Sequence, residues 1–327
     1  MGIRAMPSSH CEVIRPVSEA EWLTHLHEVG VYSFFQTPAW CNALCCYNPT
    51  FWNETVIFES GDSRFLLPLV SVQKSPGIAS LESMPWGTYG GWIGSRIPTD
   101  EEECSFIGLL LAVTRPQVSI ISRPGVPFPA RPERIREMET HILDLSQGFE
   151  HVWEHRFAAR NRTKIRNAAR HELEVFIDNG VAGIEAYKGL YRLSMERWTG
   201  DLAFDPDFLD QWIDAPPEQV SLWLCKFQGE IVAGALLFYS PTEAHYWSGA
   251  SNLEFSRFHA NNFLISHTIE DAVRRGCRTY NFGSSAGLEG VIQFKEQFGP
   301  ERVPYRNSVF MHSLWRAVRS LKTWLGK

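Results

Sequence analysis

The stretch His245–Gly299 decides the fold of this chain, and it reads HYWSGASNLEFSRFHANNFLISHTIEDAVRRGCRTYNFGSSAGLEGVIQFKEQFG. Its pattern predicts a strand, a loop, a helix, a second strand, another loop and a short helix. Apolar side chains recur at helical spacing over residues 262–275, and Gly276 can take the left-handed conformation that ends a helix. Thr279–Phe282 is then a short buried strand that ends at Gly283-Ser284-Ser285.

A strand that runs into a helix N-terminus exposes backbone N–H groups at the positive end of the helix dipole, which suits a phosphate or pyrophosphate group. Such turns are common in α/β domains, and a fold does not fix a function. The pattern alone therefore fits an ordinary hairpin, helix and strand better than a ligand site. A β-hairpin is predicted just before the decisive stretch. Its two apolar runs, Val220–Phe227 and Ile231–Ser240, flank Gln228-Gly229.

Length and composition limit the class of protein. With 327 residues the chain is long enough for two domains, and 44% hydrophobic with 21% charged residues is typical of a soluble globular protein. The longest apolar run, Phe106–Val113, is far shorter than the roughly 20 residues of a membrane-spanning helix. The first residues, MGIRAMPSSHC, lack the apolar core of a signal peptide. We therefore expect a cytoplasmic protein.

Cysteine usage and net charge exclude further classes. Seven cysteines without a Cys-x-x-Cys pair argue against a disulfide framework and against a structural zinc site, so no metal site is expected. A formal charge of -6 excludes a general nucleic-acid binder, and no DNA partner is expected. The positive charge is concentrated: residues 156–170 hold six Arg or Lys and no acid, which leaves 25 basic against 37 acidic residues elsewhere.

The segment 156–170 is expected to form a basic helix. On a helical wheel its apolar residues fill one arc and its six cations the opposite one. Like charges four residues apart destabilise a helix by a few tenths of a kcal/mol each. Two explanations stay open at this point, namely a solvated face with carboxylates nearby and a cradle for a phosphate-rich ligand.

Several motifs in this chain resemble the Fem-type acyltransferases of the GNAT superfamily. In the second half they are Ala-Gly-Ala at 233–235, Trp-Ser-Gly-Ala at 247–250, Tyr-Asn-Phe-Gly at 280–283 and above all Phe-Lys-Glu-Gln-Phe-Gly at 294–299. Phe34–Trp40, FFQTPAW, is similar to the N-terminal signature of the same family. The family includes the aminoacyltransferases that build peptidoglycan cross-bridges, and acetyltransferase-like relatives, some of them linked to exopolysaccharide systems.

The resemblance implies an α/β fold with two GNAT-like domains, each a mixed, largely antiparallel sheet flanked by helices. A boundary near Ser146-Gln147-Gly148 divides the chain into residues 1–147 and residues 148–327. The second domain is expected to begin with the basic helix and to carry the donor site. Fem-like proteins have a similar Arg-x-Arg-x-x-Ile-Arg-x-Ala run there, which favours the phosphate cradle.

An aromatic and glycine-rich loop, residues 86–94, is the expected acceptor site. Its glycines allow close backbone approach, and Trp86 and Tyr89 are large amphipathic surfaces. A Gly-x-Tyr-Gly-Gly segment occupies this place in related proteins, so the resemblance implies that Trp86, Tyr89 and Gly90 bind the acceptor. A tightly packed sheet bend explains any one of these residues equally well.

The donor anchor is assigned to the loop before the helix of the decisive stretch. Its residues are expected to be Arg257, His259, Asn262 and the N–H of Phe263, supported by Arg160 and Arg166. Ala260 and Asn262 stand where the usual acyl-CoA pattern has two small, flexible residues. A Cβ at the first of these positions can block the backbone from pyrophosphate, which favours an aminoacyl-tRNA or another bulky donor over acetyl-CoA.

Three residues are the candidate catalytic groups. Lys295, between Phe294 and Phe298, could place an ammonium against a phosphate or the developing oxyanion, although a surface lysine is the plain alternative. Glu289 lies in a glycine-rich loop and is the first candidate base, with Tyr246 as a proton donor. His245 and His259 are weaker candidates. Family members often have Asp where this chain has Asn281, so no carboxylate at that position can be the base.

These observations predict an N-acyltransferase that moves an acyl or aminoacyl group from CoA or aminoacyl-tRNA to an amine of an amino sugar, peptide or cell-envelope or polysaccharide precursor. The donor is a co-substrate, and no permanently bound cofactor is expected. The alternative is a non-catalytic Fem-like protein that binds an anionic envelope precursor. Residues 314–325 form a basic amphipathic pattern without an acid, so peripheral contact with the inner face of a membrane is a minority hypothesis beside packing on the domain.

Overall fold

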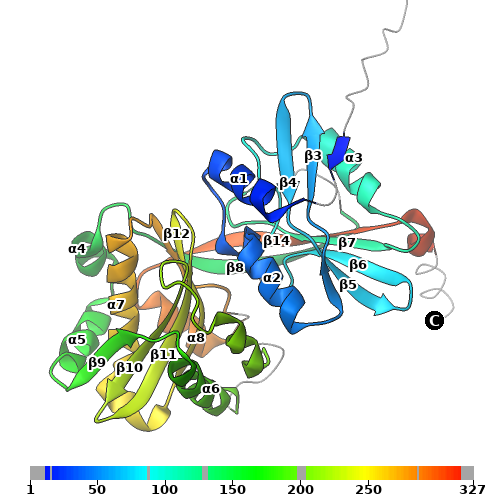
Figure 1. Cartoon of the computed structure of the whole chain (residues 1–327). Coiled ribbons are helices and arrows are strands. Elements are labelled where there is room, and N and C mark those ends of the chain that lie inside the picture. The colour runs from blue at the N-terminus through cyan, green and yellow to red at the C-terminus, as the bar shows by residue number, and fades with distance from the viewer. Residues whose placement is uncertain are drawn as a thin grey trace, which may run out of the picture. The chain divides into compact units, whose positions relative to one another are not determined.

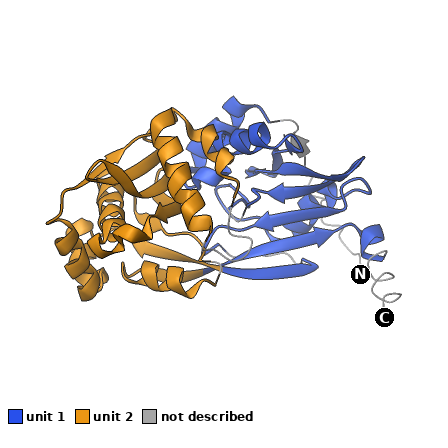
Figure 2. Ribbon diagram, turned by 90° about the horizontal axis from the view of Figure 1, so that it is seen from below, with its two compact units in different colours: residues 1–138, 304–327 blue, residues 139–303 orange. Residues whose placement is uncertain are grey.

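The structure, a computed structural model, falls into two compact units. They are residues 1–138 with 304–327 and residues 139–303 (Figure 2). The sequence predicts one boundary near residue 147, with residues 304–327 in the second domain. Strand β14 (Glu301–Met311) pairs antiparallel with β7 (Gln117–Ile121), which explains why the C-terminal segment belongs with the first unit. The structure describes residues 12–14, 17–86, 89–126, 132–196, 204–285 and 287–317.

Among its described residues, unit 1 has two groups of strands, together with the α-helices named below (Figure 1). Its strands are β1 (Glu12–Ile14), β2 (Phe51–Asn53), β3 (Val56–Ser60), β4 (Ser63–Leu67), β5 (Val70–Ser75), β6 (Ile78–Ser83) and β7, with β14 beside β7. The α-helices are α1 (Glu19–Val29), α2 (Pro38–Tyr47) and α3 (Asp100–Leu110). β6 and β7 are parallel, whereas the other described pairs of this unit are antiparallel.

Helix α3 has an N-cap and a buried apolar face that both follow from its sequence. Thr99 caps it through a box in which Thr99 and Glu102 bond each other's backbone N–H. Its buried face, Phe106, Ile107 and Leu110, packs in one apolar cluster with strand residues such as Phe58 and Phe65. The ring of Phe106 stacks on Phe58 at 4.5 Å between centroids.

Unit 2 is built on a sheet in the order β8-β13-β12-β11-β10-β9. Its strands are β8 (Arg134–Asp144, which crosses the unit boundary), β9 (Leu173–Ile177), β10 (Val220–Phe227), β11 (Glu230–Tyr239), β12 (Glu243–Ser251) and β13 (Thr279–Asn281). Only the described pair β12–β13 is parallel in this unit. The helices are α4 (Phe149–His151), α5 (Ala159–Ala168), α6 (Val181–Met195), α7 (Ala260–Arg274) and α8 (Glu289–Glu296), with the 3₁₀ segments η3 (Pro206–Trp212) and η4 (Leu253–Phe258). The predicted mixed, largely antiparallel sheets flanked by helices are confirmed.

Alternate side chains of β10 and β11 point to opposite faces of this sheet. Trp223, Cys225 and Phe227 share a cluster with Leu264 and Ile269 of α7. On the other face Gly234 lies so close to Tyr187 of α6 that a Cβ on Gly234 would be 2.5 Å from the ring. α6 and α7 therefore cover opposite faces, as Figure 1 shows. This period of two fixes the register of the hairpin.

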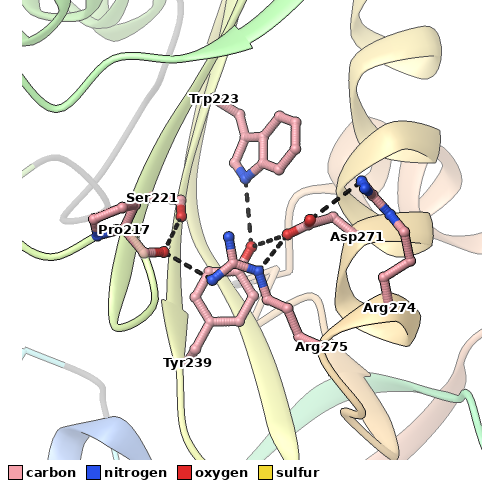
Figure 3. A network of polar contacts seen from close by, with 7 residues as sticks. All are labelled: Pro217, Ser221, Trp223, Tyr239, Asp271, Arg274 and Arg275. Atoms are coloured by element: carbon pink, nitrogen blue, oxygen red, sulfur yellow. Dashed lines mark hydrogen bonds and ion pairs between the residues drawn. The ribbon is translucent and has the colours of Figure 1, made fainter.

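A polar network holds the C-terminal end of α7 against the hairpin (Figure 3). Asp271 accepts hydrogen bonds from Arg275 at 2.5 Å and from the Tyr239 hydroxyl at 3.3 Å. Arg275 lies over the Tyr239 ring at 4.3 Å and donates to the carbonyl of Pro217 at 2.8 Å. Gly276 ends the helix at φ +82, as predicted. Because every charge here has a partner, we regard the network as structural.

The basic segment is broken rather than a single helix from 156 to 170. Arg156 ends a short π-helical segment, η2 (Val152–Arg156), and Phe157 is extended before α5 begins at Ala159. Arg162 explains the break, because its guanidinium donates to the carbonyls of Trp153, Glu154 and Phe157. Across the described residues, no helix is long and apolar enough to cross a membrane.

Candidate active site

The parallel pairing of β12 and β13 stops in the middle of β12. It joins Glu243–His245 to Thr279–Asn281, whereas β12 continues to Ser251 beside β11. The register of β11 and β12 shifts at Leu236/Leu237, which places Trp247 in a bulge. At the end of β13 the backbone hydrogen bonds between neighbouring strands therefore stop. Side chains bond the backbone there instead.

Asn281 organises the polar groups at this point. It is fully buried, and its Oδ1 accepts from the Thr140 hydroxyl at 2.7 Å and from the N–H of Gly283 at 3.0 Å. Its Nδ2 donates to Glu243 Oε2 at 3.0 Å, and Glu243 Oε1 lies 3.8 Å from Nδ1 of His245. A neutral amide can donate and accept at once, which a carboxylate cannot. Asn281 thus links β8, β12 and β13 into one buried cluster.

Lys295 reaches the same point from α8. Its side chain is 2% exposed, and Nζ donates to the carbonyls of Gly283 and Ser284, both at 2.9 Å. No carboxylate among the described residues pairs with it. Burial alone lowers the pKa of Lys295 from 10.5 to about 7. The predicted surface alternative is wrong for this lysine, because its ammonium lies inside the domain against the turn after β13.

His141 comes from β8 and is close enough to Lys295 of α8 to feel its charge. Its imidazole is fully buried, and neither ring nitrogen makes a hydrogen bond of normal geometry with the described residues. Its carbonyl accepts from the N–H of Phe282 at 2.8 Å, so it stands next to Gly283. Burial and then the positive charge of Lys295 lower the pKa of His141 below 6.5, while Glu139 and a weak contact with the Gly283 backbone act in the opposite direction.

Basic and polar residues of the predicted donor anchor lie near the N-terminus of α7. His259 is the residue before the helix and has φ +54, a left-handed conformation that few side chains adopt. Burial, then the charges of Lys164 and His171, lowers the pKa of His259. Burial and then Arg160 lowers the pKa of Lys164. Basic side chains from α5 and its C-terminal end therefore gather at the positive end of the α7 dipole.

The other predicted donor residues are engaged differently. Asn262 is buried and donates to Asn161 Oδ1 at 2.8 Å, which ties α7 to α5. Phe263 packs against the core of unit 2, with its ring 4.3 Å from that of His267. Arg166 is exposed and lies 5.6 Å from the ring of Trp153. Arg257 is exposed and lies over Phe258 at 4.7 Å. The guanidinium groups of Arg160 and Arg257 are exposed and can contact a ligand, whereas the Asn262 amide is buried against Asn161.

The two remaining catalytic candidates, Tyr246 and Glu289, differ in burial. Tyr246 follows His245 on β12, and its hydroxyl lies over Gly249, where a Cβ would be 1.7 Å away. Burial raises the pKa of the Tyr246 hydroxyl, so it stays protonated at neutral pH. Glu289 begins α8, is exposed and accepts from Gln293 at 2.8 Å. Tyr246 packs its ring against Phe282 at 6.2 Å between centroids, whereas Glu289 lies at the surface.

The predicted acceptor residues lie in unit 1. Trp86, with φ +71 and 38% exposed, lines a cavity of about 160 Å³ together with Glu82, Ser83, Pro85, Ser119, Ile121, Arg136, Met138 and Asn307. Tyr89 is buried against Phe35 and Tyr305.

Gly90 is a packing requirement rather than an exposed binding group. Its carbonyl accepts from the buried amide of Gln36 at 2.8 Å, and a Cβ on Gly90 would lie 1.8 Å from Ser83 Oγ. The Gln of the Phe-Phe-Gln-Thr-Pro motif therefore holds the glycine loop. Residues 87 and 88 of that loop lie outside the described residues.

Three members of the buried cluster were not predicted: Thr140, His141 and Glu243. Glu243 could have been predicted from the sequence, because it lies two residues before the candidate His245 and therefore on the same face of the strand. Thr140 and His141 carry none, since their place depends on the pairing of β8 with β13. In the part of the chain that the structure describes, no three His, Cys, Asp or Glu side chains gather as a metal site would require.

Comparisons with known proteins agree with this architecture. Residues 155–296 match the family model of the acetyltransferase (GNAT) domain. Among solved structures, the chain is similar to FemX, with a TM-score of 0.69 and 14% identity, covering 95% of this chain and 99% of that one. No curated protein sequence matches significantly.

Two further structures share the fold at lower scores. A tandem GNAT protein from the clavulanic acid biosynthesis pathway has a TM-score of 0.55 and 11% identity over 92% of this chain and 98% of that one. N-myristoyltransferase of Saccharomyces cerevisiae with bound myristoyl-CoA has a TM-score of 0.51 and 12% identity, over 94% and 80%. Residues 155–296, which include α7 and Lys295, therefore match the GNAT acetyltransferase domain model, and the chain as a whole shares the fold of FemX.

Proposed function

We propose that this chain is an N-acyltransferase that moves an acyl or aminoacyl group from CoA or aminoacyl-tRNA to an amine. The observation that carries the proposal is the buried Lys295 ammonium at the end of β13, which pairs with no carboxylate of the described residues and lies inside the segment that matches the GNAT model. A buried cation next to a backbone turn is suited to stabilise an oxyanion that develops as the amine attacks the donor carbonyl. Tyr246 is the proposed proton donor, because burial keeps its hydroxyl protonated.

The proposed donor site is the N-terminus of α7 with the basic groups around it. Arg160, Lys164 and Arg257 supply charge for phosphates, and the first turn of a 15-residue helix supplies the dipole. Ala260 is 5% exposed there and its Cβ narrows the backbone approach that acyl-CoA needs. We infer that a bulky, phosphate-rich donor such as aminoacyl-tRNA fits better than acetyl-CoA.

The proposed acceptor is an amine on an amino sugar, a peptide or a cell-envelope or polysaccharide precursor. The cavity beside Trp86 supplies an aromatic face, with Arg136 and Glu82 as side chains of opposite charge in its wall. An aromatic face with a few convergent polar groups is a common way to bind a polar small molecule. Trp86 is therefore the acceptor residue that we propose with most structural support, ahead of the buried Tyr89 and Gly90.

Contact with the inner face of a membrane stays a proposal of its own, together with a cytoplasmic location. Leu314 is 52% exposed and Arg316 pairs with Glu133 at 2.9 Å, while residues 318–327 lie outside the described residues. Truncation before Val318 should weaken co-sedimentation with anionic vesicles if this contact exists, and equal binding of both proteins would exclude it.

Donor binding tests the function directly. Acetyl-CoA, a longer acyl-CoA and an aminoacyl-tRNA mimic should be titrated at two salt concentrations, and we expect saturable binding of one class. Arg160→Ala should weaken that binding about fivefold to tenfold, because a charge-assisted contact to phosphate is lost. Arg274→Ala is the matched control, since it removes an exposed arginine at the opposite end of α7. Equal losses in both variants would indicate unspecific attraction, and contradict the assigned site.

Turnover is the second half of the test. Binding of a donor followed by amide formation on an amino-sugar or peptide acceptor supports the transferase. Binding of an anionic envelope precursor without any transfer, with no donor bound, would support the non-catalytic alternative instead.

A further inference from the structure

The cavity beside Trp86 is built on one face of the sheet of unit 1. In that sheet Glu82 of β6 is paired with Ser119 of β7. Asn307 of β14 is paired with Ile121, two residues further along β7, so all four wall residues share a face. The apolar residues between them along β6 and β7 belong to the cluster with α3 on the opposite face. The cavity therefore lies on the face that α3 does not cover.

Arg136 of β8 supplies a positive charge to the wall of this cavity. It is exposed, and its guanidinium makes no ion pair or hydrogen bond with a side chain of the described residues. Glu137, the next residue, points to the other face and pairs with Arg306 at 2.8 Å. A guanidinium presents its N–H donors as a planar fork that matches the two oxygens of a carboxylate or phosphate. Arg136 is therefore available to an anionic ligand.

The negative charge in the same wall already has a partner. Glu82 Oε1 lies 3.2 Å from Nζ of Lys74, which comes from the neighbouring strand β5. This ion pair offsets the repulsion that Glu82 alone would exert on an anion. The carboxylate keeps lone pairs that can accept hydrogen bonds from hydroxyl groups of a ligand. Arg136 therefore sets the charge preference of the cavity.

Asn307 adds neutral hydrogen-bond donors to the wall. Its Oδ1 accepts from the Ser119 hydroxyl at 2.7 Å, which fixes the orientation of the amide. Its Nδ2 has no acceptor among the described residues, so two N–H donors remain for a ligand. Together with Arg136 these groups suit ligand oxygens that carry negative charge, because charge-assisted hydrogen bonds are the strongest of their kind.

The aromatic side of the cavity is held in a strained backbone conformation. Trp86 has φ +71 and Met84 has φ +53, in the left-handed region that few non-glycine residues adopt. The ring of Trp86 is fixed by Tyr47 at 5.8 Å and Phe51 at 6.0 Å between centroids. Strain of this kind clusters at ligand sites, where the surrounding packing maintains it. The indole is therefore a preformed flat surface for a ligand.

We propose that this cavity binds an amino-sugar ring that carries one carboxylate or phosphate group, and that Arg136 selects for the anionic group. The cavity of about 160 Å³ has room for one ring, since about 150 Å³ holds a benzene molecule. Arg136 bonds the anion, Trp86 covers the apolar face of the sugar, and Glu82 accepts from ring hydroxyls. That this sugar is the acceptor rests on the proposed function, whereas its binding does not.

Three amino sugars that differ in a single substituent test this selection. They are glucosamine, glucosamine 6-phosphate and glucosaminuronate, which carry a neutral hydroxymethyl, a phosphate and a carboxylate group at the same carbon. In calorimetric titrations of the full chain without a donor, we expect one anionic sugar to bind about tenfold or more tighter than glucosamine. The tighter of the two anionic sugars identifies the anion. Equal affinities, no binding, or tighter binding of the acidic dipeptide alanyl-glutamate would overturn the proposal.

Variants on β8 separate Arg136 from general positive charge. Arg136→Gln should remove the preference for the anionic sugar and leave the affinity for glucosamine within about twofold, whereas Arg136→Lys should restore part of the preference. Arg134→Gln is the matched control, because Arg134 is exposed on the same face of the strand but does not line the cavity. Equal losses in Arg136→Gln and Arg134→Gln would indicate unspecific attraction and overturn the assignment.

Transfer measurements distinguish this inference from the proposed function. Binding of an anionic amino sugar that depends on Arg136, without transfer from any donor, would refute the transferase and support the sugar site. Transfer to a peptide amine, without binding of any anionic amino sugar, would support the transferase and overturn the sugar site.

Discussion

Unit 2 buries two lysine side chains and stabilises them in opposite ways. Lys188 on α6 is 3% exposed and lies 2.5 Å from Asp210, with Glu185 and Asp207 also within ion-pair distance. Lys295 is 2% exposed and contacts carbonyls alone. Burial opposes the charge of Lys188, but Asp210 and Glu185 outweigh it and raise its pKa, whereas burial lowers the pKa of Lys295 to about 7.

The difference separates a cation that serves the fold from one that we propose to be functional. The carboxylates around Lys188 join α6 to η3, so its charge serves the fold. No described carboxylate compensates the charge of Lys295, and an apolar side chain of similar size would be less costly in its place. A buried amine with a pKa near neutrality at the end of a strand is typical of functional sites.

Replacing Lys295 by Met should have the largest effect on activity. We expect at least a hundredfold loss of transfer rate, the usual cost of removing one group that stabilises a developing oxyanion. The melting temperature at pH 7 should stay the same or rise, because an uncompensated buried charge disappears. Lys188→Met is the matched control and should keep the rate within a few fold. A comparable loss of rate in both variants would contradict the proposal that Lys295 acts in the reaction and Lys188 only in the fold.

The pH dependence of stability should differ between wild type and Lys295→Met. The folded pKa of Lys295 is lowered to about 7 from 10.5, so between these values the unfolded chain binds a proton that the folded chain does not. Stability of the wild type should therefore rise as pH increases through this window, by about 2 kcal/mol or more at 1.4 kcal/mol per unit. Urea unfolding of both proteins at pH 7 and pH 9.5 measures it, and equal pH slopes would contradict the lowered pKa.

Lys188→Met should destabilise the fold more than it affects the reaction. It leaves Asp210, Glu185 and Asp207 without their shared cation, although these carboxylates are partly exposed. We expect a loss of about 1–2 kcal/mol in the free energy of unfolding, since exposed partners can recover hydration. Urea titration at pH 7 provides the value, with Arg192→Met as a control for the weaker 3.8 Å contact to Asp207. A stability equal to that of the wild type would mean that the ion pairs do not join α6 to η3.

The sequence predicted the elements of this comparison better than their surroundings. Periodicity predicted the hairpin, α7 and the short β13, because period-two and helical patterns are local. The Phe-Lys-Glu-Gln-Phe-Gly motif singled out Lys295 through resemblance. Its burial was not predictable, since it depends on the packing of α8 under the Gly283-Ser284 turn.

Long-range pairing accounts for what the sequence did not show. β14 joins β7 across nearly 190 residues, so the C-terminal segment belongs with unit 1 and no composition change marks the boundary. In the same way, His141 and Thr140 reach the cluster only through the pairing of β8 with β13. The basic segment 156–170 was expected as one helix, and Arg162 interrupts it by binding three carbonyls.

The smallest expected effect concerns the carboxylate that the sequence favoured. Glu289 is exposed and bonded to Gln293, so Glu289→Gln should change kcat/KM by less than about threefold, whereas removal of a true general base costs roughly a hundredfold or more. Glu243→Gln is the matched variant, because Glu243 lies in the cluster beside His245 and Asn281, and its loss should be the greater of the two. Steady-state rates from pH 6 to 9 decide between them. A hundredfold loss of kcat/KM in Glu289→Gln would instead place the reacting centre at the exposed start of α8. Lys295 lies on the buried side of the same helix, so it would then act only through the Gly283-Ser284 turn.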